Sequence, residues 1–298
     1  MQLFLNANYD FVSKKVRRTA MTISAIIVCI GIVFFFTKGF NLSIDFTGGT
    51  IFQYKFPTTI TIEELRSEMK SQGLKTVTLQ NFGDSSDELL IRVGSEAEAK
   101  LVKAYMNQKY PTGLDLRREE SVGPSIGSDL RTQAAWAVIF SWLGILLYVA
   151  WRFESKFGIG AIIALVHDVL ITCTAFVVLG LEFNATVLAA ILTLIGYSIN
   201  DTIVVFDRIR EMMHAERPRS DEHFISVINR AINITLSRTI ITSLTVLLVV
   251  VILYLVGGEV IHNFAFALIV GIITGTYSSV FIATPIMIEL RMRVSLKD

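Results

Sequence analysis

The hydrophobic residues of this chain gather into six long runs, which are separated by more polar segments. A helix needs about 20 predominantly apolar residues to cross the hydrocarbon core of a bilayer, and the runs have lengths close to that value. The pattern therefore predicts an α-helical polytopic membrane protein with six transmembrane helices. We place these helices at residues 19–37, 134–151, 157–179, 185–206, 239–256 and 264–288.

The composition agrees with this pattern. Hydrophobic residues make up 52% of the 298 residues and charged residues only 18%, with a mean hydropathy of +0.57. An ordinary soluble domain has less apolar surface to bury and more charge. The net charge of +1 gives no indication of a nucleic-acid partner. Cys29 and Cys173 fall inside apolar runs, so we interpret them as small buried hydrophobic side chains and not as a disulfide or metal ligands.

Basic residues are distributed unevenly between the two ends of the predicted helices. The short loops around residues 180–184 and 257–262 contain no Lys or Arg, whereas the opposite ends are rich in them. By the positive-inside rule, both termini are predicted to be cytoplasmic and residues 38–130 to lie outside. The run 19–37 follows a basic cluster as a signal peptide does, but it is long and lacks a small-residue cleavage site, which favours an uncleaved anchor.

The segment 38–130 has the pattern of a folded α+β domain. Strands are predicted at residues 50–56, 76–82, 89–93 and 114–122. Helices are predicted to begin at Thr61 and Ser95, each with Glu three residues later to complete a capping box. The order β-α-β-β-α-β is that of the ferredoxin-like fold. That fold supports many functions, and because the segment has no His or Cys we predict a binding surface there.

Two further segments are predicted on the cytoplasmic side. Residues 1–18 mix apolar and polar side chains before and within a basic cluster, and they form either an interfacial segment on the inner leaflet or a frayed terminus. The connection 207–238 lies within the membrane domain 131–298. Its part 222–235 has apolar residues at helical spacing, which predicts a helix packed against the inner face of the membrane.

Three charged residues within or at the edge of the apolar runs, Asp168, Asp201 and Arg238, stand out as candidate functional residues. A charge at the centre of a membrane helix costs about 2.5–3.5 kcal/mol on insertion scales, so it needs a reason to be there. Tyr197 and Ser198 precede Asp201 by four and three residues, and their hydroxyls are predicted to face its carboxyl. Burial favours the protonated form of a carboxyl, which suits a group that binds and releases a proton.

Arg238 begins the fifth predicted helix at a depth similar to that of Asp201. Thr235, Thr242 and Thr245 share a helix face with it and form a polar stripe that suits a water path. The pair Asp201 and Arg238 is either a proton-relay pair or a fixed ion pair that sets helix packing. We favour the relay, because ionisable groups inside membranes usually have a function.

Asp168 lies near the middle of the third predicted helix, after His167. Two interpretations stay open: a second protonatable group, or a buried carboxylic acid bonded to a neighbouring helix. The remaining histidines are scattered over loops, so no metal site and no cofactor is predicted. Small residues at i+4 spacing on the sixth helix predict close helix packing, within this chain or against a partner. They are Ala267, Gly271, Gly275 and Ser279.

Five motifs occur in order along the chain and together cover most of its length. They are Tyr9-Asp10-Phe11, the segment from Leu42 to Gly49, Val122-Gly123-Pro124, the segment from Ile199 to Glu211, and the segment from Asn233 to Thr239. This pattern resembles that of the SecF protein translocase subunits of the SecD/SecF family, within the resistance–nodulation–division superfamily.

The resemblance implies a non-enzymatic subunit of the bacterial cytoplasmic (inner) membrane with residues 38–130 in the periplasm. It implies SecD, the SecYEG channel and YajC as partners, with a preprotein at the periplasmic side and the proton-motive force as the energy source. The family's proton-path residues correspond to Asp201, Arg238 and Thr242. A single set of six helices also predicts a pseudo-symmetric partner half, which fits a separate SecD.

Two other functions remain compatible with the sequence. A passive scaffold would hold SecD beside the channel without using Asp201. Half of a proton-driven exporter of small molecules or lipids would need a substrate pocket near the middle of the membrane. An intramembrane hydrolase is disfavoured, because no nucleophile and base lie in suitable positions.

Overall fold

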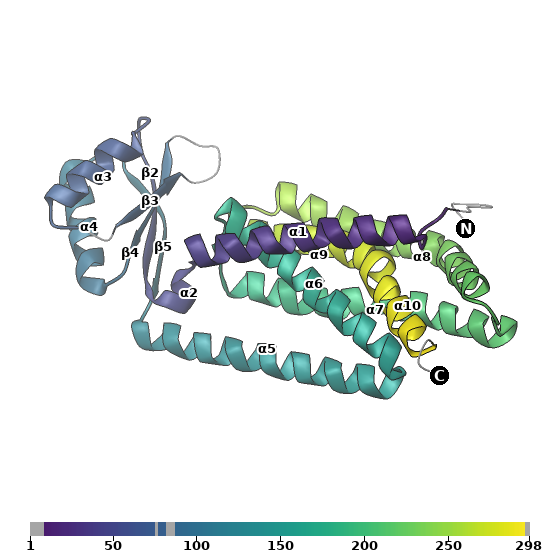
Figure 1. Ribbon diagram of the computed structural model, residues 1–298. Coiled ribbons are helices and arrows are strands. Elements are labelled where there is room, and N and C mark those ends of the chain that lie inside the picture. The colour runs from purple at the N-terminus through teal and green to yellow at the C-terminus, as the bar shows by residue number, and fades with distance from the viewer. Residues whose placement is uncertain (1–8, 75–76, 82–86, 296–298) are drawn as a thin grey trace. The chain divides into compact units, whose positions relative to one another are not determined.

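The computed structural model describes residues 9–74, 77–81 and 87–295, without the side chains of Glu259 and of residues 293–295 (Figure 1). The chain divides into two units, a membrane unit (Met1–Asn41 and Ala137–Asp298) and a sheet unit (Leu42–Trp136). Among the described residues, six helical segments are long and apolar enough to cross a membrane, as the hydrophobic runs predicted. They are α1 (Lys14–Lys38), α5 (Pro124–Arg152), α6 (Ser155–Leu179), α7 (Ala185–Glu216), α8 (Asp221–Val256) and the combined segment Val260–Met292.

The sixth membrane segment is not a regular helix throughout. It consists of α9 (Glu259–Ser278), the π-helix η1 (Ser279–Ala283) and α10 (Thr284–Ser295). Pro285 lies two residues after the end of η1, and proline has no N–H to donate and its ring clashes with the carbonyl four residues earlier. A widened turn before proline relieves that clash, which accounts for the position of η1.

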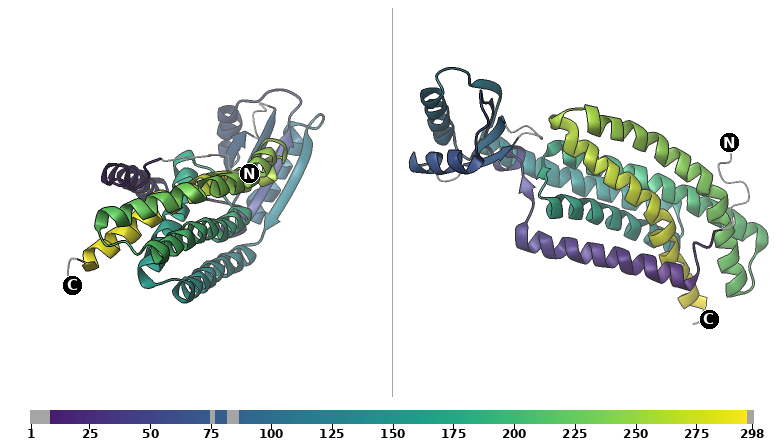
Figure 2. Two further views of the ribbon diagram at one scale, coloured as in Figure 1. Left: turned by 90° about the vertical axis from the view of Figure 1, so that its right-hand side faces the viewer. Right: turned by 90° about the horizontal axis from the view of Figure 1, so that it is seen from above.

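Glycines bring three membrane helices into close contact. A Cβ added at Gly271 of α9 would lie 2.5 Å from Leu194 of α7, and one at Gly275 would lie 3.1 Å from Ser198. On α6, a Cβ at Gly160 would lie 2.7 Å from the carbonyl oxygen of Ala283 in η1. The small residues of the sixth segment therefore pack within this chain, and α6, α7 and α9 lie side by side, as Figure 2 also shows.

The segment before α1 is held by side-chain amides of α8. The backbone N–H of Tyr9 donates to Asn233 (2.9 Å) and that of Phe11 to Asn229 (2.9 Å), and both amides donate back to the carbonyl of Tyr9. Val12 is only 1% exposed. Residues 9–13 are therefore not frayed but packed on the membrane unit. The prediction for residues 1–8 lies outside the described residues.

The connection between the fourth and fifth membrane helices is shorter than residues 207–238. Helix α7 continues to Glu216, and α8 begins at Asp221 with Ser220 as its N-cap. Phe224 and Ile228 are buried in the same core as Ile209 and Met287. The predicted helix around residues 222–235 is thus the first part of α8, and its apolar side chains pack on the chain's own helices.

The sheet unit has a four-stranded antiparallel sheet in the order β3-β4-β2-β5. Its strands are β2 (Gly49–Lys55), β3 (Thr78–Asn81), β4 (Glu88–Val93) and β5 (Asp115–Val122), and its two longer helices are α3 (Ile62–Ser71) and α4 (Glu96–Lys109). Phe52 of β2 lies opposite Ile91 of β4 and Glu119 of β5. This is the predicted ferredoxin-like arrangement. The ends of the predicted strand 76–82 fall on residues outside those described.

One face of the sheet is buried under the two helices. Alternate residues of β2 and β4 point into this core, where they meet Leu65 and Met69 of α3 and Val102 and Met106 of α4. Ser95 caps α4 as predicted, because its hydroxyl accepts from the N–H of Glu98 (3.3 Å). Thr61 precedes α3 but makes no side-chain cap bond, so the first capping box is not formed.

Three short elements were not predicted from the sequence: β1 (Asn41–Leu42), α2 (Ile44–Thr47) and β6 (Glu182–Phe183). They are two to four residues long, which is too short to leave a periodic pattern. Gly48 ends α2 at a φ of +72°, and Gly49 begins β2 at a φ of +124°. Both conformations favour glycine, so the Gly48-Gly49 pair is a requirement of the backbone.

We expect Gly49→Ala to destabilise the protein by roughly 2–4 kcal/mol, through backbone strain and a forced shift of β4. A Cβ at this position would lie 2.4 Å from the carbonyl oxygen of Val93. Chemical unfolding of the purified chain measures the loss. Gly73→Ala is the matched control, because its φ of +86° is also positive but nothing lies within 4 Å of its Cβ position. Equal losses in the two variants would contradict the steric part of this account.

Candidate functional site

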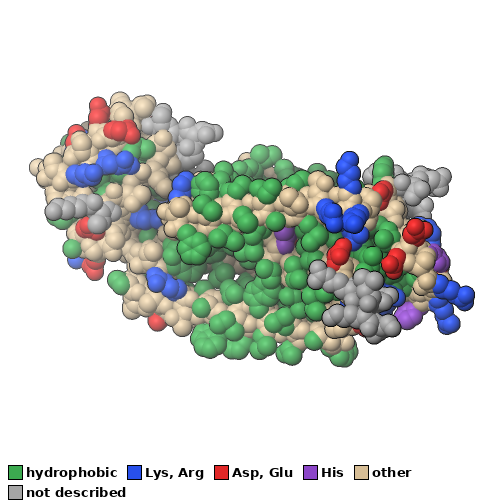
Figure 3. Space-filling view, in the orientation of Figure 1, with side chains coloured by type: hydrophobic (Ala, Val, Ile, Leu, Met, Phe, Trp, Pro, Cys, Tyr) green, Lys and Arg blue, Asp and Glu red, His purple; other side chains and the backbone are tan. Residues whose placement is uncertain are grey.

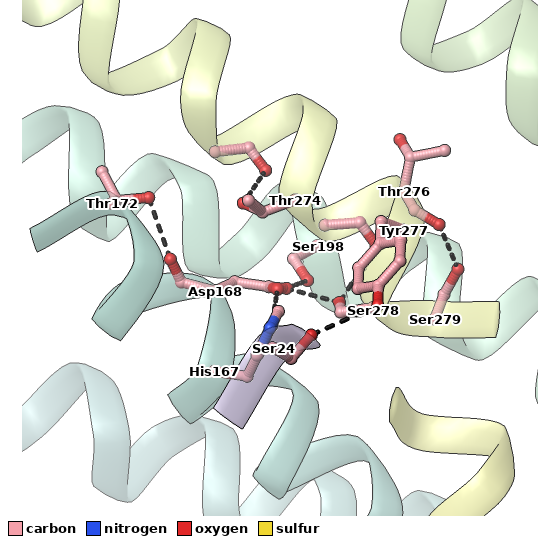
Figure 4. Close-up of polar contacts among 12 residues, drawn as sticks. Ser24, His167, Asp168, Thr172, Ser198, Thr274, Thr276, Tyr277, Ser278 and Ser279 are labelled. Carbon is pink, nitrogen blue, oxygen red and sulfur yellow. Dashed lines mark hydrogen bonds and ion pairs between the residues drawn. The ribbon is translucent and has the colours of Figure 1, made fainter. Parts of the chain in front are cut away.

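Asp168 is the centre of a buried hydrogen-bond cluster between α6, α7 and α9 (Figure 4). Its side chain is 1% exposed. Its Oδ2 accepts from the hydroxyls of Ser198 (2.5 Å) on α7 and Ser278 (2.7 Å) on α9. Its Oδ1 lies 2.9 Å from Nδ1 of His167. Asp168 is thus bonded to two neighbouring helices, as one of the two interpretations from the sequence required.

The Asp168 carboxyl accepts from two hydroxyls and contacts the imidazole Nδ1, and a hydrogen bond to an ionised carboxylate is stronger than one between neutral groups. The neighbouring helix turn supports the cluster, because Thr172 donates to the backbone carbonyl of Asp168 (2.9 Å). A buried carboxylate with this many donors can exist inside a membrane unit where an isolated one cannot. The cluster therefore has the composition of a site that holds a charge or exchanges it for a proton.

Asp201 forms a second, sparser cluster one turn further along α7. Its carboxyl is 2% exposed, and Oδ2 accepts from the hydroxyl of Ser243 on α8 at 3.2 Å. The Ser243 hydroxyl lies 2.7 Å from that of Thr276 on α9. Asp201 therefore has fewer and longer bonds than Asp168, although it is buried almost as completely.

The two clusters share the same pair of helices. On α7, Ser198 of the Asp168 cluster precedes Asp201 by three residues. On α9, Thr276 of the Asp201 cluster precedes Ser278 of the Asp168 cluster by two residues. A change in the packing of α7 against α9 therefore affects both carboxyls at once. The close approach at Gly275 lies in the same turns, which makes this helix contact the one that couples the clusters.

Arg238 and Thr242 do not join these clusters. Arg238 is exposed, and among the residues that the structure describes it makes no ion pair with Asp201. The hydroxyl of Thr242 donates to the carbonyl of Arg238 (2.8 Å), and that of Thr245 donates to the carbonyl of Thr242 (2.8 Å). The fixed Asp201–Arg238 ion pair considered from the sequence is therefore absent from this conformation.

Some residues of the clusters were missed or misassigned from the sequence. Ser198 was predicted to face Asp201 but bonds to Asp168, and Tyr197 has a buried hydroxyl with no partner among the described residues. Ser243 and Thr276 were not singled out, although each lies in a group of hydroxyl residues within its membrane helix, with Thr242 next to Ser243 and Ser278 near Thr276. That signal identifies a polar position but does not tell which helix it faces.

This fold and this site define a class: multi-pass α-helical membrane proteins that carry a ferredoxin-like domain after the first helix and buried carboxyls between later helices. The family model "Protein export membrane protein SecD/SecF, C-terminal" matches residues 102–293, and the model "SecD/SecF GG Motif" matches residues 33–59. The chain belongs to the SecD/SecF family of protein export membrane proteins, as its motifs indicated.

Curated relatives match almost the whole chain. The protein translocase subunit SecF of Desulfurispirillum indicum is 46% identical over 94% of this chain and 91% of its own length. That of Calditerrivibrio nitroreducens is 45% identical over 94% of this chain and 93% of its own length. These relatives are named as translocase subunits, which supports an auxiliary role in protein export.

Solved structures share the fold. The crystal structure of SecDF, a translocon-associated membrane protein from Thermus thermophilus, superposes with a TM-score of 0.84 at 36% identity over 97% of this chain. A second SecDF crystal structure, in a super-membrane-facing form, gives a TM-score of 0.72 at 35% identity over the full chain. This chain spans 40% of the length of either solved chain.

Proposed function

We propose that this protein works with SecD as an auxiliary export subunit that uses the proton-motive force to promote preprotein translocation through the SecYEG channel. The proton passes through a relay of Asp201, Arg238 and Thr242, with Asp168 as a further protonatable group. The single observation that carries this proposal is the Asp201 carboxyl, which is 2% exposed inside a membrane helix and has Ser243 as its hydrogen-bond donor at 3.2 Å. Ionisable groups in such positions are retained for function.

The relay proceeds through two states of Asp201. When the carboxyl is protonated it is neutral and fits the sparse environment around Ser243. When it loses the proton it needs a counter-charge, and Arg238 is the basic residue at similar depth on the neighbouring helix α8. Pairing requires α8 to turn or shift against α7, because Arg238 is exposed in the present conformation. The proton cycle therefore drives repacking of α7 and α8, which moves the sheet unit.

The energies are of the right size for this step. One charge that crosses 100 mV releases about 2.3 kcal/mol. A hydrogen bond to a charged group contributes about 1.5–3 kcal/mol, so one proton can offset the loss of a bond such as that between Ser243 and Asp201. Repacking of a whole helix interface would need several protons or a compensating contact with a partner. The separate SecD half is the natural source of such a contact.

The proposed setting is the bacterial inner membrane, with both termini cytoplasmic and the sheet unit periplasmic. Figure 3 supports this orientation: hydrophobic side chains cover the visible face of the membrane unit, and charged side chains gather at the end where α1 begins. The sheet unit is then placed to meet the preprotein, and YajC is a further proposed partner.

Inverted membrane vesicles test the function. Vesicles from cells without this chain are compared with vesicles that contain it, and preprotein translocation is measured with and without an imposed proton gradient. We expect the chain to increase translocation only when the gradient is present. An equal increase with and without the gradient would favour the passive scaffold, and no increase at all would reject the export role.

A further inference from the structure

A groove runs along the outside of the Asp168 cluster, between α1, α6 and α9. It has a volume of about 710 Å³, and most of its lining is apolar, with Ile23, Ile171 and Ile273 among the lining side chains. The titratable residues in the lining are Lys15 of α1, His167 of α6 and Tyr277 of α9. His167 is therefore the residue that connects this groove to the buried Asp168.

His167 has one bonded and one unbonded ring nitrogen. Its Nδ1 lies 2.9 Å from Oδ1 of Asp168, while Nε2 is buried and has no hydrogen-bond partner among the described residues. The side chain as a whole is 9% exposed. A buried nitrogen without a partner is costly, and such exceptions in a native fold require an explanation.

We propose that His167 accepts a proton at Nε2 from a hydronium ion that reaches this groove and passes a proton from Nδ1 to Asp168. Asp168 was assigned to the relay above without a route for its proton, and His167 supplies that route. The inference rests on the proposed function only in that the proton is used to drive translocation. Its protonation chemistry stands by itself.

The transfer balances in two steps. A hydronium ion that reaches the groove transfers a proton to the lone pair of Nε2 and is left as a neutral water, which converts the neutral imidazole into an imidazolium with both nitrogens protonated. The Nδ1 proton then moves along the existing 2.9 Å contact to Oδ1 of Asp168. The products are a neutral imidazole with its proton on Nε2 and a neutral Asp168, and reversal of the same steps returns the proton. Imidazole suits this role, because its charge changes near neutral pH.

The two charged groups near the imidazole act in opposite directions on an imidazolium, because the Asp168 carboxylate favours it and the Lys15 ammonium in the same groove disfavours it. On its own helix the nearest titratable group is Asp168, and α7 contributes the uncharged Ser198 to the same carboxyl. On α9 the ring of Tyr277 lies 6.1 Å from that of His167, and on α1 Lys15 lines the same groove. The Tyr277 hydroxyl donates to the carbonyl of Ala20 in α1 (3.0 Å), so Tyr277 links α9 to the first helix.

Nitrogen-15 NMR of histidine-labelled full-length protein in lipid bilayers tests the chemistry directly. The His167 signals are identified by their loss in His167→Asn. We expect Nε2 to gain a proton, and Nδ1 to lose its proton to Asp168, when the buffer is changed from about pH 8 to about pH 5, an interval that spans the charge change of an unperturbed imidazole. An Nε2 whose protonation does not change over that range would overturn the proposal.

Translocation in vesicles tests the use of the proton. Asn at this position keeps an N–H donor near the place of Nδ1 but has nothing in the place of Nε2. We expect His167→Asn to lower the gradient-driven rate on the order of 100-fold, the effect of removing a proton-transfer group. His214→Asn, which changes an exposed histidine, is the control and should leave the rate unaltered.

The two measurements separate this inference from the proposed function. If Nε2 titrates but wild-type vesicles show no gradient-driven translocation, the proposed function fails and the proton site remains. If the wild type is gradient-driven and His167→Asn equals it, the route through His167 is wrong and the proposed function stands.

Discussion

Asp201→Asn is expected to abolish the gradient-driven part of translocation while the complex with SecD still assembles. Asn has nearly the same shape as Asp, and its carbonyl oxygen can still accept from Ser243, whose hydroxyl lies 3.2 Å from the carboxyl in the wild type. Helix packing should therefore persist. What is lost is a group that can bind and release a proton within the membrane.

The measurement compares preprotein translocation at equal amounts of assembled complex, with and without an imposed proton gradient. Glu211→Gln is the matched control, because it neutralises a carboxylate of the same helix whose side chain is 68% exposed. We expect the control to behave like the wild type, since exposed ion pairs contribute about 0–1 kcal/mol. A gradient-driven rate that survives in Asp201→Asn would show the carboxyl to be structural and would favour the scaffold.

Asp168→Leu is expected to destabilise the membrane unit by roughly 3–6 kcal/mol, a large part of the 5–15 kcal/mol typical of folded proteins. Leucine removes the acceptor for Ser198, Ser278 and His167 together. Each buried donor left without a partner costs about 1–3 kcal/mol. Ser278 regains part of this through the carbonyl of Gly275, to which its hydroxyl already lies at 3.2 Å.

Thermal unfolding of the purified protein measures this effect, with Asp168→Asn as the conservative comparison. Asn keeps an acceptor oxygen and the side-chain volume, so its loss of stability should be clearly smaller. If Asp168→Leu unfolds at the same temperature as the wild type, the cluster does not hold α6, α7 and α9 together.

The fold could be predicted from the sequence because the length of an apolar run and the spacing of hydrophobic residues are local properties of the chain. Each apolar run long enough to span a bilayer became a helix, and the strand and helix patterns of residues 49–122 gave the order of the ferredoxin-like sheet. The helices extend beyond the predicted runs, since polar residues such as those of 207–216 continue α7 outside the apolar part. The π-helix before Pro285 was not predicted, although proline gave a signal for it.

Only part of the site could be predicted from the sequence. Asp168 and Asp201 stood out because a carboxyl in an apolar run is costly wherever the helix faces. Their partners depend on how the helices rotate against one another, which no local pattern contains. Ser198 shares a helix face with Asp201 but lies toward α6, and Ser243 instead of Arg238 reaches Asp201 from α8. Gly275, which lets α9 approach Ser198, sets that rotation.

The most direct test of the central claim is whether Asp201 changes its protonation during the cycle. Infrared difference spectroscopy of the complex in proteoliposomes, with aspartate labelled by carbon-13, follows the carboxyl band when a proton gradient is imposed. We predict a protonated-carboxyl band that changes with the gradient in the wild type and is missing in Asp201→Asn. A wild-type spectrum without any gradient-dependent band from Asp201 would contradict the account.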